Sequence, residues 1–136
     1  MQSNDDVAGR WLSQAEHDLA ASEASRAAGH YEWACFQAQQ AAEKALKAFL
    51  YFQGERGLHG HSIRALLMAC RDLQPDFAQF RQAADLDQYY SPTRYPNGLP
   101  DTAPHEFYEE EHAERCIGHA RPLLSFVRSL LAPPTS

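Results

Sequence analysis

Apolar residues recur at intervals of three and four positions along almost the whole chain, a spacing that places them on one face of an α-helix. The clearest stripes are Ala8, Trp11, Leu12, Ala15, Leu19 and Ser22, then Ile63, Leu66, Leu67, Cys70 and Leu73, and finally Ala113, Ile117, Ala120, Leu124, Val127 and Leu131. The sequence shows no strict alternation of apolar and polar residues, the pattern typical of a half-buried strand. It therefore predicts an all-α fold, an up-and-down antiparallel helical bundle of about five helices.

Glycine, proline and capping residues divide this pattern into segments. The expected helices span about residues 7–28, 31–52, 63–74 and 76–90, and a last one begins near His105. Asp5 or Asp6 is expected to cap the first helix, Gly29 to end it, and Ser62 to cap the third. Alanine dominates the middle of the second helix, and small side chains allow close approach, so we expect this helix at the centre of the bundle.

The size and charge of the chain limit its class. Its 136 residues are expected to form one domain, 1–136, with residues 1–5 and 132–136 frayed. The formal net charge of −6 argues against a non-specific hold on nucleic acid, which needs a positive face. No run is apolar enough to span a membrane, and the acidic start is unlike a signal peptide. Three widely spaced cysteines fit a reducing, cytoplasmic setting.

The helical pattern stops at residues 87–96, a segment we call the strap, where Pro92 and Pro96 favour extended backbone. Binding groups concentrate on loops held by a rigid scaffold. Tyrosine rings can stack on bases, and an arginine can fork onto a phosphate. The candidate ligand-binding residues are Asp87, Tyr89, Tyr90, Arg94 and Tyr95.

Two interpretations of the strap remain open. In the first, Asp87 orients Arg94 toward a ligand. In the second, these two side chains form an internal ion pair that pins the strap, and the tyrosines are packing residues. Lys44 and Lys47 are weaker ligand candidates, because together with Glu43 they are expected to form a solvated helix face with a Glu–Lys pair at the favoured spacing.

Arg56 and His61 are a weak candidate for a catalytic pair that cleaves RNA without a metal ion. The histidine would move a proton, and the arginine would stabilise charge on phosphorus. The histidines show no spacing recognised for zinc, and the sequence has no phosphate-binding loop or dinucleotide fingerprint. We therefore expect no metal and no cofactor.

Four segments in order carry a family resemblance: YEWACFQAQQAAEKALK at 31–47, GHS at 60–62, LDQYY at 86–90 and TRYP at 93–96. Together they resemble the HEPN family, small helical domains of prokaryotes that also occur at the end of the large human protein sacsin. The resemblance covers almost the whole chain. It implies an up-and-down helical bundle, frequent homodimers and nucleotide binding.

The resemblance also implies biological roles. Such proteins are often partnered with a minimal nucleotidyltransferase in toxin–antitoxin pairs, and many are ribonucleases with an arginine–histidine motif. We expect an accessory protein that is not an enzyme and binds a nucleotide or another phosphate-bearing ligand. In this interpretation Arg94 contacts phosphate, and Tyr90 or Tyr95 stacks on a base. The alternatives are a metal-independent ribonuclease toxin and an interaction module for dimerisation and partner binding.

Overall fold

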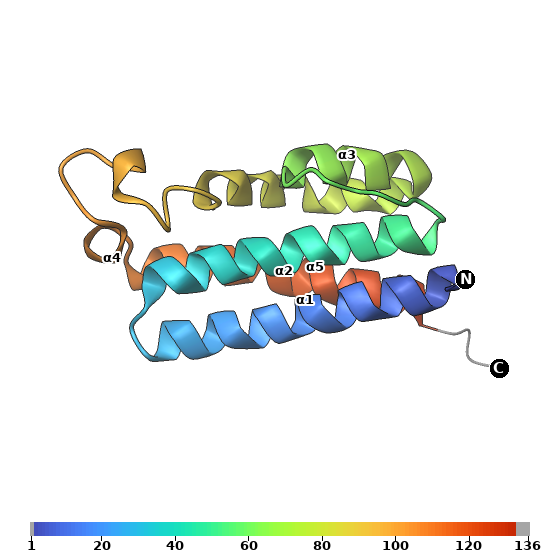
Figure 1. Ribbon diagram of the computed structural model, residues 1–136, viewed down its shortest axis with the longest axis horizontal. Coiled ribbons are helices and arrows are strands. Elements are labelled where there is room, and N and C mark those ends of the chain that lie inside the picture. The colour runs from blue at the N-terminus through green and yellow to red at the C-terminus, as the bar shows by residue number, and fades with distance from the viewer. Residues whose placement is uncertain (1, 133–136) are drawn as a thin grey trace.

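The computed structural model describes residues 2–132, which form helices joined by loops (Figure 1). The α-helices are α1 (Asn4–Ala27), α2 (Tyr31–Phe52), α3 (Ile63–Leu73), α4 (Pro104–Phe107) and α5 (Glu110–Leu131), and the 3-10 helices are η1 (Pro75–Tyr89) and η2 (Pro96–Gly98). No strand occurs in this part of the chain, so the all-α prediction is confirmed. No helix within these residues has the length and apolar character needed to cross a bilayer.

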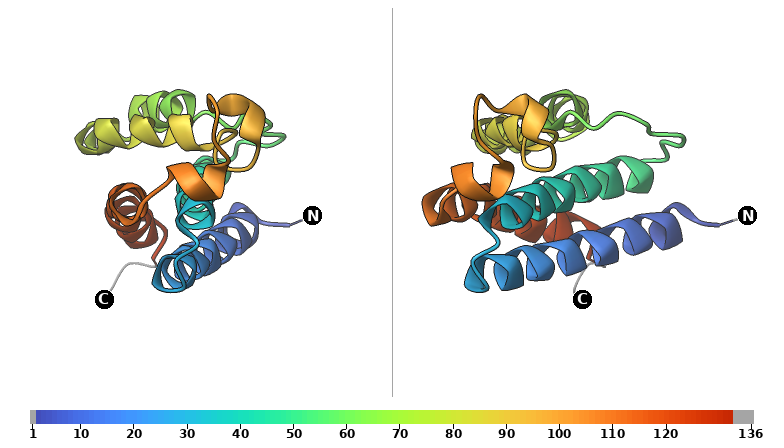
Figure 2. Two further views of the ribbon diagram at one scale, coloured as in Figure 1. Left: turned by 90° about the vertical axis from the view of Figure 1, so that its left-hand side faces the viewer. Right: turned by 60° about the vertical axis from the view of Figure 1, so that its left-hand side comes forward.

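The helices pack around α2. The long helices α1, α2 and α5 lie side by side, and α3 with η1 forms a second layer on the other side of α2 (Figures 1 and 2). Helix α2 contacts each of the other α-helices and η1. The central position predicted for residues 31–52 is therefore confirmed.

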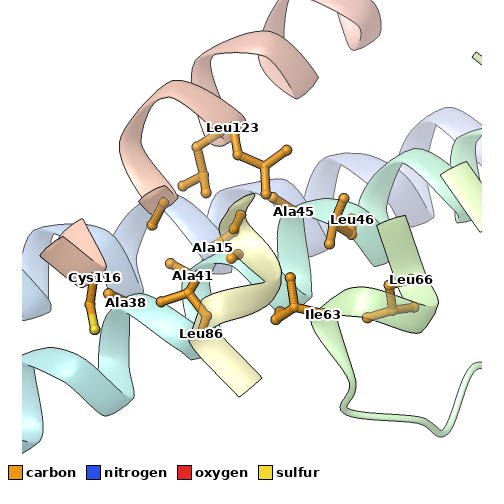
Figure 3. Close-up of a cluster of buried hydrophobic side chains, with 14 of the residues drawn as sticks. Ala15, Ala38, Ala41, Ala45, Leu46, Ile63, Leu66, Leu86, Cys116 and Leu123 are labelled. Atoms are coloured by element: carbon orange, nitrogen blue, oxygen red, sulfur yellow. The ribbon is translucent and has the colours of Figure 1, made fainter. Parts of the chain in front are cut away.

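The alanines of α2 make this packing possible. Those at 34, 38, 41, 42, 45 and 48 are fully buried. Around them pack larger aliphatic side chains from the other helices, among them Ile63 of α3, Leu86 of η1 and Leu123 of α5 (Figure 3). Burying one such side chain stabilises the fold by roughly 1.5–3 kcal/mol. The small residues on α2 let neighbours from both layers reach one continuous core.

The fourth helix differs from its prediction because it follows a tighter period. Its inward positions recur every three residues: Phe77, Phe80, Ala83, Leu86 and Tyr89. A 3-10 helix has three residues per turn, so this spacing puts all five on one face. The α-helical period expected over 76–90 would place Ala84 on the same face as Phe77 and Phe80, but the structure buries Ala83 instead.

The N-terminal boundary also differs. Ser3 caps α1, since its Oγ accepts a hydrogen bond from the backbone N–H of Asp6 at 3.0 Å. The predicted aspartate cap is therefore wrong, and α1 already begins at Asn4 within the stretch expected to fray. Residue 1 and residues 133–136, also expected to fray, lie outside the described residues.

Other boundaries agree or are refined. Gly29 follows α1 with a φ of +84°, and the Oγ of Ser62 accepts a hydrogen bond from the third residue of α3 at 3.1 Å. The helix expected from His105 onward is divided. Tyr108 and Glu109 are extended, with ψ angles of 134° and 172°, so the short α4 ends before α5 begins.

Candidate functional site at the strap

The guanidinium of Arg94 lies among aromatic rings. Its Cζ is 4.3 Å from the ring centre of Phe36 on α2. The rings of Tyr90 and Tyr95 are 4.7 and 5.3 Å away. Its Nε donates a hydrogen bond to the backbone oxygen of Tyr90 at 2.9 Å. Aromatic faces attract cations, so these contacts hold the guanidinium in place without neutralising it.

No carboxylate within residues 2–132 forms an ion pair with Arg94. The side chain is half-buried, and its Nε already has a partner. A guanidinium has five N–H donors, so the four on its two Nη atoms remain for another group. A positioned fork of this kind suits a phosphate or a carboxylate.

Local hydrogen bonds fix the strap. The buried hydroxyl of Thr93 donates to the backbone oxygen of Tyr89 at 2.7 Å, and the N–H of Arg94 donates to the backbone oxygen of Ser91 at 3.0 Å. Gly98 packs directly on Pro92, where an added Cβ would lie 3.2 Å from the proline Cα. The strap is thus a compact turn whose shape positions Arg94.

A cavity of about 240 Å³ opens beside Arg94. Trp33, Thr93 and His105 line it, and Glu32 contributes one acidic group. Trp33 exposes 46% of its surface, which leaves an aromatic face free for stacking. The cavity therefore combines a cationic fork with an exposed aromatic ring.

Asp87 has a different role from both predictions. Its Oδ1 accepts the backbone N–H of Ile63 at 2.6 Å, and its Oδ2 accepts the Ser62 hydroxyl at 3.1 Å and the N–H of Arg64 at 3.2 Å. The first N–H groups of a helix lack partners within the helix, and a carboxylate there also complements the helix dipole. Asp87 therefore anchors η1 to the start of α3. The predicted Asp87–Arg94 contact, as an ion pair or as an orienting bond, is wrong.

The tyrosines of the strap divide between packing and site. Tyr89 is buried beside Tyr108, and its hydroxyl accepts a hydrogen bond from the Arg115 guanidinium at 3.5 Å. Burial raises the pKa of Tyr89 above its usual value, and the Arg115 hydrogen bond opposes this. Tyr90 is half-buried and Tyr95 is exposed, so these two, not Tyr89, flank the open side of Arg94.

His61 joins the strap through ring stacking. Its ring lies 4.9 Å from that of Tyr90 at an interplanar angle of 17°. Its Nδ1 is 3.3 Å from both carboxylate oxygens of Glu43, which is 4% exposed. Lys47, equally buried, donates to Glu43 at 3.1 Å, and Gln39 donates to the backbone oxygen of His61. The solvated face predicted for Glu43 and Lys47 is therefore wrong, because His61 of the loop before α3 contacts Glu43 and Trp11 of α1 lies over the Lys47 ammonium.

The remaining predicted cations are engaged elsewhere. Lys44 pairs with Asp18 of α1 at 2.6 Å. Arg56 donates to the backbone oxygen of Tyr51 and to the side chain of Asn4. Tyr51 lies eight residues beyond Glu43, the partner of His61, which is about 12 Å along a helix. Arg56 and His61 thus contact positions about two turns apart on α2, whereas His61 and Arg94 both contact the ring of Tyr90.

Sequence reasoning missed Phe36, Gln39 and Glu43 as part of this site. They lie three and four positions apart, so they form one row along α2. The sequence did contain a signal for them: an aromatic, an amide and a carboxylate side chain lie in one helical row outside the alanine stripe. No group of three or more histidine, cysteine, aspartate or glutamate side chains within residues 2–132 converges as a metal site would require.

Comparisons with known proteins agree on one family. The model of the HEPN domain matches residues 8–130. TT1696 from Thermus thermophilus is 41% identical, with a TM-score of 0.81 over 90% of this chain and 96% of that one. ST0689, described as an archaeal HEPN homologue, is 39% identical, with a TM-score of 0.74 over 97% and 100%. An HEPN domain protein from Thermotoga maritima is 28% identical, with a TM-score of 0.70 over 90% and 97%.

A comparison of the sequence with curated proteins found no match. The family match nevertheless spans both helical layers and the strap, and the similar structures are covered almost completely. The chain belongs to the HEPN domain family.

Proposed function

We propose that this protein binds a nucleotide or a related phosphate-bearing ligand at the strap. The observation that supports it is the half-buried Arg94 guanidinium, held by three aromatic rings and without a carboxylate partner in residues 2–132. The free Nη groups would bind phosphate, and Tyr95 or Trp33 would stack on the base. Tyr90, whose ring contacts both Arg94 and His61, would form one wall of the site.

Calorimetric titration with a small panel of nucleotides tests this proposal. We expect binding in the micromolar range for the wild type, an affinity that corresponds to about 8 kcal/mol. Arg94→Ala should abolish measurable binding, and Arg94→Lys should weaken it, since lysine keeps the charge but loses the fork. Arg10→Ala is the matched control, because Arg10 is an exposed arginine on α1 whose partner is Gln2.

Two results would contradict nucleotide binding at the strap. One is the absence of binding across the panel with a folded wild type. The other is equal binding by wild type and a folded Arg94→Ala. Unchanged helical circular dichroism would show that the variant is folded, since Arg94 makes only local contacts within the strap and with α2.

A second candidate function is metal-independent cleavage of RNA. The observation that favours it is that His61 and Arg94 contact the same ring, that of Tyr90. The His61 ring centre is 4.9 Å and the Arg94 Cζ is 4.7 Å from the centre of that ring. The Glu43 carboxylate faces Nδ1 of the histidine. In this scheme Glu43 orients the imidazole, His61 moves a proton and Arg94, not Arg56, stabilises the phosphorane. Cleavage that survives chelator and disappears in His61→Ala would support it, and intact RNA at high protein concentration would exclude it.

We also propose that the protein acts with partners in the cytoplasm, as a homodimer and with a nucleotidyltransferase of a toxin–antitoxin pair in a prokaryotic cell. Trp33, Tyr95 and Phe107 are exposed large hydrophobic residues, which supports a protein contact near the strap. Light scattering tests the dimer, since the chain has a mass of 15.3 kDa. Co-expression with a nucleotidyltransferase encoded beside it tests the partner, and elution as separate species would refute it.

A further inference from the structure

Helices α3 and η1 lie together in the outer layer of the bundle (Figure 1). They line an open groove of about 240 Å³ whose residues are separate from those of the strap cavity. Its floor is apolar and includes Leu67, Met68 and Phe77. Met68 exposes 50% of its surface, and the nearby Leu73 exposes 51%. The unbranched methionine side chain adapts to different partner surfaces, and exposed methionines are common in grooves that bind helices.

Three arginines line this apolar floor: Arg64 and Arg71 from α3 and Arg81 from η1. Within residues 2–132 none of their guanidinium groups has a hydrogen bond, an ion pair or an aromatic contact. The chain has 12 lysines and arginines, and the other basic side chains each have a polar partner. The basic groups without a partner in the described chain therefore gather at one groove.

This arrangement fits a helix that carries apolar residues on one face and carboxylates beside them. Arg64 and Arg71 are seven residues apart, which is two turns and about 10.5 Å along α3. Carboxylates seven positions apart on a docked helix have the same separation. Apolar residues between them would meet the floor of Leu67 and Met68.

The overall charge of −6 does not prevent such a contact. Exposed charges are screened over about 8 Å at physiological ionic strength, so the local groups at the groove dominate. Exposed Asp72 and Asp76 are neighbours of groove residues in sequence, but no ion pair within residues 2–132 joins them to the three arginines. Asp87 already accepts hydrogen bonds from the start of α3. The groove is therefore locally basic on an acidic protein.

We propose that the α3–η1 groove is a docking site for an acidic amphipathic helix of another protein. The apolar floor would bind the leucine face of that helix, and Arg64, Arg71 and Arg81 would pair with its glutamates. This surface is distinct from the strap, so the inference does not depend on nucleotide binding.

Fluorescence anisotropy with a labelled synthetic helix tests the groove. The probe has leucines at i, i+3, i+4 and i+7 and glutamates on both flanks of that stripe. A second probe carries lysine in place of each glutamate, and a third is a glutamate-rich peptide without leucines. We expect only the first to bind well, and its affinity should fall as salt rises, because the contacts combine apolar burial with exposed ion pairs.

The double variant Arg64→Glu/Arg71→Glu should weaken binding of the acidic helix by about tenfold or more, because two attractive pairs become repulsive. Arg10→Glu makes the same type of change on α1 and should leave binding unaffected. If the double variant fails to fold, Arg71→Gln replaces it, with a smaller loss expected. Both groove arginines are exposed, so their substitution should leave the melting temperature nearly unchanged.

Five outcomes would overturn the proposal. They are no binding of the acidic helix, equal binding of the lysine probe, and equal binding by the wild type and a folded double variant. The fourth is a single-stranded RNA oligonucleotide that binds at the groove more tightly than the helix, which would identify a nucleic-acid site. The fifth is a wild type that does not bind the peptide together with a double variant whose oligomeric state is changed. That result would identify a second copy of the chain as the occupant of the groove.

Discussion

The buried pair of Glu43 and Lys47 provides a direct test of the packing around α2. The two side chains expose only 5% and 4% of their surfaces, and their charged atoms are 3.1 Å apart. Lys47→Met removes the ammonium and leaves the Glu43 carboxylate in the interior, where only Gln39 at 3.5 Å and the His61 ring remain as partners. Breaking a buried pair in this way costs about 3–5 kcal/mol.

That loss is large, since the total free energy of unfolding of a single domain is about 5–15 kcal/mol. Urea unfolding followed by circular dichroism should show a much lower midpoint for Lys47→Met, with an unchanged slope. The double variant Glu43→Leu/Lys47→Met should recover most of the stability, because no unpaired charge is then buried. Its cost should be clearly smaller than that of Lys47→Met alone.

Arg128→Met is the matched control. It breaks a pair with Glu16 in which the side chains expose 55% and 38% of their surfaces, so its cost should be below about 1 kcal/mol. A cost for Lys47→Met as small as that of the control would refute the burial argument, and would mean that this pair is exposed to solvent.

Three further predictions concern other parts of the fold. Asp87→Ala should lower the free energy of unfolding by about 1–2 kcal/mol in urea titrations, as loss of a helix cap does, whereas exposed Asp72→Ala should have little effect. Burial raises the pKa of Tyr108 from 10.0 to about 12, so its stabilising contribution is complete below pH 10 and is lost as the pH rises toward 12. Ultraviolet difference titration should show this late ionisation. Gly98→Ala should weaken nucleotide binding in calorimetry with a small change in stability, because its Cβ would press on Pro92 and shift the strap; unchanged affinity would contradict the role of that contact.

Nearly all of the secondary structure could be predicted from the sequence. The spacing of apolar residues reports which face of a helix is buried, and Gly29 and Ser62 mark helix ends through backbone conformation and a local hydrogen bond. These signals act between residues a few positions apart. A helix was predicted at the position of η1, but as an α-helix, because its three-residue period was interpreted with the period of an α-helix.

The candidate site could be predicted only in part. The sequence singled out Arg94, Tyr90 and Tyr95, and the structure places the three together because they belong to one short turn. It did not reveal that Phe36 completes the aromatic enclosure. That contact joins α2 to the strap across more than fifty positions of sequence, so helix packing alone creates it.

By itself, the sequence determined where most of the chain is helical and which apolar faces form the core, since both depend on local spacing. Only the tertiary structure decided which polar side chains meet. Asp87 caps a helix that begins 24 positions earlier, and Glu43 faces a histidine 18 positions later. A carboxylate has the same local pattern whether it is solvated, caps a helix or pairs with a buried lysine. The choice among these depends on which distant segment packs over it, because burial makes an unpaired charge costly and thereby selects its partner.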